Sequence, residues 1–174
     1  MPPRDCFLTF AAGLIRLLLI LNLLALVLFA LALVFSVPIA TAVLPRLAVK
    51  VGSPEGARVV LTAIRWTLLV GIGAGVAAHV IFRALEWLVT LVRRGDPFVP
   101  DAARQIERIG WALLGLQLLD LSFGLIAWQI SRFMPGAFDW QLSFTGWIAV
   151  LVAFVLARVF RVGATMRDDL AGLV

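Results

Sequence analysis

The order of apolar and polar residues divides the chain into four long apolar runs separated by short polar segments. The runs cover about residues 14–38, 66–88, 109–130 and 143–161. Each one approaches or exceeds the ~20 residues with which an α-helix crosses a hydrocarbon core of ~30 Å. The pattern predicts an all-α integral membrane protein, in which residues 1–174 form a single domain: a four-helix transmembrane bundle with short connecting loops.

Composition agrees with this prediction, since 63% of the residues are hydrophobic, 14% are charged and the mean hydropathy is +1.06. Soluble domains have about 45–50% apolar residues. The first run precedes "ATA" at residues 40–42, which fits a signal-peptidase site. However, its apolar stretch is longer than the ~7–15 residues of a signal peptide core. We therefore expect a retained helix.

The basic residues indicate an orientation. Lys50 is the one lysine among 15 basic residues, and the arginines lie mainly at the ends of the runs, as membrane anchors do. This distribution argues against direct nucleic-acid binding. One side of a four-span protein would carry nine basic residues: Arg4, Arg16, Arg93, Arg94, Arg104, Arg108, Arg158, Arg161 and Arg167. The other side would carry five, namely Arg46, Lys50, Arg58, Arg65 and Arg132. The positive-inside rule therefore predicts that both termini and the middle loop lie in the cytoplasm.

The connections contain helix-start signals. Ser53 followed by Pro54 predicts an N-cap and a first helical residue. Gly95 to Pro97 predicts a turn, and Asp101 predicts the cap of a short basic helix before the third span. The segment "MPGAFDW", residues 134–140, predicts a turn with aromatic residues at the headgroup level.

Each run has a stripe of small and polar residues on one helical face. Lipid is as apolar as leucine, so membrane helices associate through small side chains and hydrogen bonds. We expect close helix packing at Gly71, Gly75, Gly124 and Gly146. Gly71 and Gly75 form a GxxxG pair, which can also join two copies of the chain, so a homodimer remains an alternative. The four stripes are Asn22, Ala25, Ala32 and Ser36; Gly71, Gly75, Ala78, His79 and Glu86; Gln117, Asp120, Gly124, Ala127 and Ser131; and Gly146, Ala149, Ala153 and Ala157.

Several ionisable and amide side chains lie within or beside the apolar runs. His79, Arg83 and Glu86 are spaced i, i+4 and i+7 and share a helical face with the glycines. If tryptophans mark the interfaces, His79 and Asp120 lie at similar depth. An unpaired carboxylate there costs ~2.5–3.5 kcal/mol, so Asp120 is expected to pair with Arg83 or His79. We also expect Gln117 and Asn22 to be hydrogen-bond neighbours of Asp120 in this polar cluster. Glu86 is expected to pair with Arg158 or Arg94.

The polar cluster has two interpretations. It either fixes the rotation of the helices or responds to a proton or a small ligand. No nucleophile–base pair, P-loop or dinucleotide fingerprint is present, so we expect neither an enzyme nor a cofactor. With one histidine and one cysteine, His79 and Cys6, we also expect no metal site.

Two segments carry a resemblance to a known family: "RRGDPFVPDAARQIERIGW" and "VLARVFRVGATMRDDLAGLV". With Gly95, Pro97 and Phe98 in the first and Val159, Phe160, Arg161 and Gly163 in the second, they resemble an uncharacterised bacterial family of four-span proteins of the inner (cytoplasmic) membrane, the YoaS-like group, a domain of unknown function. Relatives often carry an acidic residue where this chain has Arg158.

This resemblance implies no established activity. It does imply a partner, because members are often encoded beside a small Cro/C1-type helix-turn-helix regulator. We therefore expect an interaction or sensor protein with a cytoplasmic partner surface at Arg104, Arg108, Arg161 and Arg167. Proton or small-ligand response through the polar cluster is the alternative.

Overall fold

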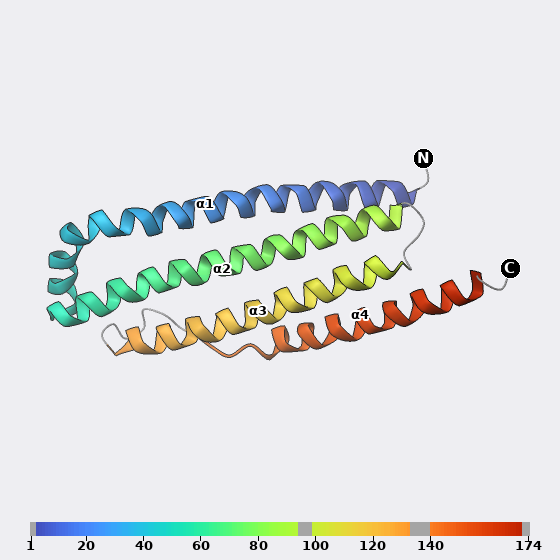
Figure 1. Cartoon of the computed structure of the whole chain (residues 1–174). Helices are drawn as coiled ribbons and strands as arrows, with labels where there is room; N and C mark the ends of the chain where they lie inside the picture. Colours follow the sequence, from blue (N-terminus) through green and yellow to red (C-terminus); the bar gives the residue numbers. More distant parts are fainter. Residues whose placement is uncertain (1–2, 94–98, 133–139, 172–174) are drawn as a thin grey trace. The chain divides into compact units, whose positions relative to one another are not determined.

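The computed structural model describes residues 3–93, 99–132 and 140–171, with the backbone alone for residues 3–7 and 168–171. These residues form four α-helices: α1 (Pro3–Val51), α2 (Pro54–Arg93), α3 (Pro100–Ser131) and α4 (Phe144–Ala171) (Figure 1). Each helix contains a segment long and apolar enough to cross a membrane: Leu8–Val51, Pro54–Arg93, Pro100–Ser131 and Phe144–Arg167. The prediction of four such helices is confirmed.

The helices are longer than the apolar runs that predicted them. The 49 residues of α1 would extend about 74 Å if straight, more than twice the thickness of a hydrocarbon core. The first apolar run reaches Pro38, whereas α1 continues through Pro38 and Pro45. A proline inside a helix removes one backbone donor and bends the helix. Figure 1 shows the last turns of α1 leaving the direction of its earlier part.

A two-residue connection joins α1 to α2. Gly52 has a φ of 79°, which side-chain-bearing residues rarely adopt, and its N–H donates to Ala48 O at 2.9 Å. Ser53 Oγ then accepts a hydrogen bond of 3.0 Å from Gly56 N, and Pro54 begins α2. This confirms the predicted cap and first helical residue.

The start of α3 differs from its prediction. The helix begins at Pro100, and Ala102 N donates to Val99 O at 2.9 Å. Asp101 is therefore a first-turn residue and not a cap, and its Oδ1 lies 2.9 Å from Arg104 Nη2. No separate basic helix precedes the span, since α3 is continuous to Ser131. The predicted turns at residues 95–97 and 134–140 fall mainly outside the described residues.

The chain divides into two compact units. Unit 1 comprises Met1–Leu23, Ala77–Gly115 and Phe144–Val174, so it takes parts of all four helices. Unit 2 comprises Leu24–Val76 and Leu116–Ser143, with parts of α1, α2 and α3. Every contact described below lies within one of these units.

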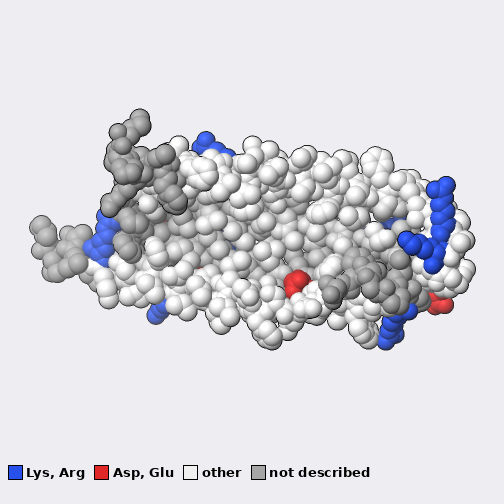
Figure 2. Space-filling view, turned by 180° about the vertical axis from the view of Figure 1, so that it is seen from behind, with Lys and Arg blue, Asp and Glu red and all other residues white. Residues whose placement is uncertain are grey.

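The buried contacts consist mainly of alanine. The buried alanines of unit 1 are Ala84, Ala102, Ala103, Ala153, Ala157 and Ala164, and those of unit 2 are Ala57, Ala63 and Ala127. Ala127, Ala153 and Ala157 were predicted from the stripes. Among residues 8–51, α1 has no buried residue, and uncharged residues cover most of the face shown in Figure 2. Small residues thus bring the helices close while large apolar side chains stay at the surface.

Glycines mark the closest approaches. In unit 2 a Cβ added at Gly71 would lie 3.1 Å from the Phe29 ring of α1, and one at Gly124 would lie 2.6 Å from the Trp140 ring. Both glycines are among the four expected packing positions, and the other two, Gly75 and Gly146, are half-buried. Two further packing glycines are Gly73 against Leu119 at 3.1 Å and Gly110 against Phe154 at 3.2 Å.

Candidate functional site: a donor-rich groove on α2 and α3

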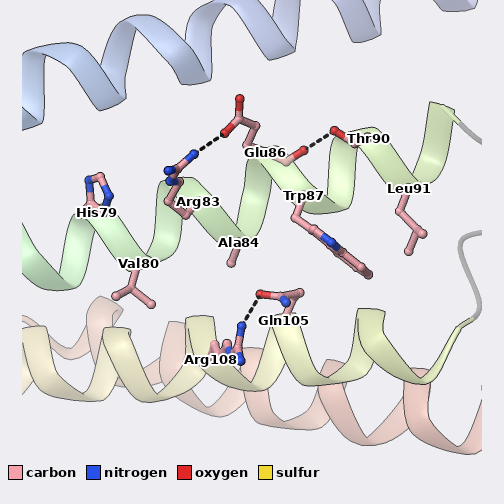
Figure 3. Close-up of a pocket in the computed structure, with 10 residues that line it drawn as sticks. All are labelled: His79, Val80, Arg83, Ala84, Glu86, Trp87, Thr90, Leu91, Gln105 and Arg108. Atoms are coloured by element: carbon pink, nitrogen blue, oxygen red, sulfur yellow. Dashed lines mark hydrogen bonds and ion pairs between the residues drawn. The ribbon is translucent and has the colours of Figure 1, made fainter.

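Unit 1 contains a groove of about 740 Å³ between α2 and α3, which we call the His79–Arg108 groove. A volume of this size suits a small molecule. In Figure 3, His79, Arg83 and Glu86 project from α2 on the side of α1, and Gln105 and Arg108 project from α3 towards α2. The complete lining is His79, Val80, Arg83, Ala84, Glu86, Trp87, Thr90, Leu91, Gln105 and Arg108.

Glu86 is the anionic member of the groove lining. Its Oε1 lies 3.2 Å from Arg16 Nε of α1, and its Oε2 lies 3.4 Å from Arg83 Nη1. Among the described residues, Glu86 thus pairs with Arg16 and Arg83 and not with the expected Arg158, while pairing with Arg94 stays a prediction. Arg94 is outside the described residues. Both arginine side chains are largely exposed, so each pair contributes at most about 1 kcal/mol.

The other polar side chains of the groove supply mostly donors. Arg108 Nη1 donates to Gln105 Oε1 at 3.4 Å. Within the described residues, this bond uses one of the five Arg108 N–H groups and neither of the two Gln105 amide N–H groups. Thr90 Oγ1 donates to the Glu86 carbonyl at 2.9 Å. His79 Nδ1 is buried and makes no hydrogen bond with any residue that the structure describes. The geometry thus brings His79, Arg83 and Glu86 together as the spacing predicted.

Asp120 belongs to unit 2 and has a partner that the sequence did not indicate. Trp140 Nε1 donates a hydrogen bond of 3.3 Å to Asp120 Oδ1. Gln117, predicted as a neighbour of Asp120, instead donates from Nε2 to Ser143 O at 3.5 Å. Because Arg83 and His79 belong to unit 1, their pairing with Asp120 stays a prediction.

The remaining predicted residues occupy different positions. Asn22 is half-buried on α1, and Arg158 is exposed on α4. Arg161 Nη2 lies 2.6 Å from Glu107 Oε2, an ion pair that joins α4 to α3 in unit 1. Arg104 and Arg167 are exposed, while Arg108 lines the groove. The described residues include no group of three His, Cys, Asp or Glu that could hold a metal ion.

A family model described as "Protein of unknown function (DUF2975)" matches residues 39–173. The chain belongs to the DUF2975 family. The match includes the complete His79–Arg108 groove, the Trp140–Asp120 pair and all of α2, α3 and α4. No curated protein and no solved structure matches the chain. With four helices that can each cross a bilayer, this DUF2975 member has the build of a multi-pass membrane protein.

Sequence reasoning missed two polar contacts of the DUF2975 chain. One is the Trp140–Asp120 hydrogen bond. The other joins Arg65 of α2 to Ser36 of α1: Arg65 Nη2 donates to Ser36 O at 2.9 Å, and Arg65 Nε donates to Ser36 Oγ at 3.2 Å. Its signal was Ser36 itself, a polar side chain inside an apolar run, because such groups form hydrogen bonds between membrane helices.

Proposed function

We propose that this DUF2975 member is a non-enzymatic interaction protein of the bacterial inner membrane, related to the YoaS-like group, that binds a small cytoplasmic helix-turn-helix regulator. Both termini and the loop between α2 and α3 face the cytoplasm in this proposal, following the excess of arginine on that side. The partner class comes from the family resemblance.

One observation carries the proposal: an otherwise apolar chain presents exposed charges of both signs on the first turns of α3 and on α4. Asp101 pairs with Arg104 on the surface, and Arg161 pairs with Glu107 between the two helices. Arg167 adds a further exposed cation to the same unit. Such a mixed surface supports binding to a charged protein, because complementary rim charges determine partner choice and association rate.

The test uses the full-length protein in detergent and the purified regulator encoded beside it. We expect Arg104→Gln with Arg167→Gln to weaken binding by about tenfold, since two exposed charge contacts together contribute roughly 1–2 kcal/mol. The matched control is Arg46→Gln with Arg58→Gln, two exposed arginines of unit 2. Unchanged binding by the first variant, or an equal loss in the control, contradicts the proposal.

A second function, response to a proton or a small ligand, is supported by the polar groups inside the apolar segments. Asp120 has a neutral indole as its hydrogen-bond partner, and His79 Nδ1 has none among the described residues. Intramembrane ionisable residues with weak partners are candidates for function. If Asp120→Asn left stability, pH response and cellular phenotype unchanged, this second function would be rejected.

A further inference from the structure

The His79–Arg108 groove has many more hydrogen-bond donors than acceptors. Glu86 supplies its carboxylate, but Arg16 and Arg83 occupy both oxygens. A guanidinium has five N–H donors, and Arg83 and Arg108 each use one of them within the described residues. The Trp87 indole and the Gln105 amide add N–H groups. A ligand that satisfies this lining must contribute several acceptor oxygens.

The charge of the groove also selects an anion. Its lining has two permanent cations, Arg83 and Arg108, and one anion, Glu86, which Arg16 further neutralises. Arginine binds phosphate oxygens through paired N–H groups, and these charge-assisted hydrogen bonds are stronger than neutral ones. A phosphate group therefore fits the groove better than a cation or a neutral amide.

The apolar part of the lining indicates the rest of the ligand. Val80, Ala84 and Leu91 line the groove on the α3 side of α2, the side from which Arg108 approaches, whereas Arg83 projects on the α1 side (Figure 3). Trp87 has the amphipathic ring that is enriched at membrane interfaces, and Arg108 directly precedes the third apolar run. Basic pockets between membrane helices at this level bind phospholipid headgroups.

We propose that the His79–Arg108 groove is a binding site for the phosphate headgroup of an anionic phospholipid. Arg83 and Arg108 bind the phosphate oxygens, Gln105 and Trp87 donate further hydrogen bonds, and the acyl chains extend over the exposed Val80. Of the four arginines of the expected regulator surface, Arg108 lines this groove, whereas Arg104, Arg161 and Arg167 do not.

Native mass spectrometry of the full-length protein in detergent tests this site. Phosphatidylglycerol is the anionic probe and phosphatidylcholine is the zwitterionic one. We expect wild-type protein to retain phosphatidylglycerol preferentially, and Arg83→Gln with Arg108→Gln to lower its affinity about 30-fold, because each arginine near the headgroups contributes about fourfold to sixfold. Circular dichroism reports whether the variant keeps its helices.

Controls distinguish this site from general attraction and from a free anion. The double variant Arg46→Gln with Arg58→Gln removes the same charge from unit 2 and is expected to lower the affinity less than about twofold. An equal loss in that control, or an unaffected groove variant with intact helices, overturns the proposal. Displacement of phosphatidylglycerol by excess inorganic phosphate also overturns it, because the groove would then recognise a small anion and not a lipid.

Discussion

The Trp140 indole donates its N–H to Asp120 Oδ1 at 3.3 Å and thereby provides the partner of a carboxylate inside an apolar helix. We expect Trp140→Phe to destabilise the protein by about 1–3 kcal/mol, because the carboxylate then remains unsatisfied. Unfolding in mixed micelles measures this loss. Trp66→Phe, at an exposed tryptophan of the same unit, is the control. The loss should disappear in an Asp120→Leu background, and a loss that persists there would refute the role of the hydrogen bond.

Among the glycines of α3, Gly124 has the least room for a side chain. A Cβ there would lie 2.6 Å from the Trp140 ring, so Gly124→Ala must displace the indole that binds Asp120. We expect a loss of about 1–3 kcal/mol, typical of overpacking. Gly115→Ala is the matched control on the same helix, since a Cβ there has no neighbour within 4 Å. Alanine favours helix, so that control should be neutral or slightly stabilising, and equal effects would contradict the packing argument.

Arg65 connects α2 to the proline-containing part of α1. Arg65→Ala removes both hydrogen bonds to Ser36, and Ser36→Ala removes the hydroxyl but keeps the backbone carbonyl. Since hydrogen bonds from charged donors contribute about 1.5–3 kcal/mol, Arg65→Ala should cost more than Ser36→Ala in thermal unfolding. Arg58→Ala, at an exposed arginine of α2, should cost little. If Ser36→Ala cost more stability than Arg65→Ala, the hydrogen bond from Arg65 Nη2 to the Ser36 carbonyl would not stabilise the protein.

The α1–α2 connection depends on two adjacent residues. Ser53→Ala should cost about 1 kcal/mol through the lost cap to Gly56 N. Gly52→Ala should cost a similar amount, because φ is +79° while the added Cβ would meet no atom within 4 Å. Chemical denaturation in detergent measures both. Gly13→Ala is the control, with equally open space and no positive φ. If Gly52→Ala stabilised the protein as Gly13→Ala should, backbone strain would be excluded.

Glu86 reduces the positive charge of the His79–Arg108 groove. We expect Glu86→Gln to raise phosphatidylglycerol affinity by severalfold, because Arg16 and Arg83 lose their carboxylate partner and become available to a phosphate. Folding stability should change by no more than about 2 kcal/mol, about 1 kcal/mol for each of the two ion pairs, since both arginine side chains are largely exposed. Native mass spectrometry beside thermal unfolding separates the two effects, and a lower lipid affinity would contradict the electrostatic account.

The sequence predicted those features that depend on local pattern. Apolar length predicted four helices, Ser53 and Pro54 predicted the start of α2, and small residues predicted the contacts at Gly71 and Gly124. Helix ends were predicted less well, because hydropathy detects the apolar part of a helix and not its polar extensions. Pro38 did not end α1, as a membrane helix can continue through a proline when other groups bind its carbonyls.

The partners of the polar residues could not be predicted. Periodicity places Glu86 on a helical face. Its partner, however, depends on how far the neighbouring helix is shifted along its axis, and the periodicity of a single helix gives no information about that shift. The structure selects Arg16 of α1. Likewise, Asp120 could be assigned a depth, whereas its Trp140 partner lies outside any helix. Long-range polar contacts therefore required the structure.

The predominance of alanine at the buried contacts has an entropic consequence. Alanine has no rotamers to lose, so ordering Ala57, Ala102 and Ala153 between helices carries no side-chain conformational entropy cost, unlike the ordering of leucine. Many leucines of α1, among them Leu17, Leu23 and Leu24, are exposed and do not incur this cost. Modest dispersion forces at these positions can therefore contribute to helix association, because the backbones approach closely and few internal motions are frozen.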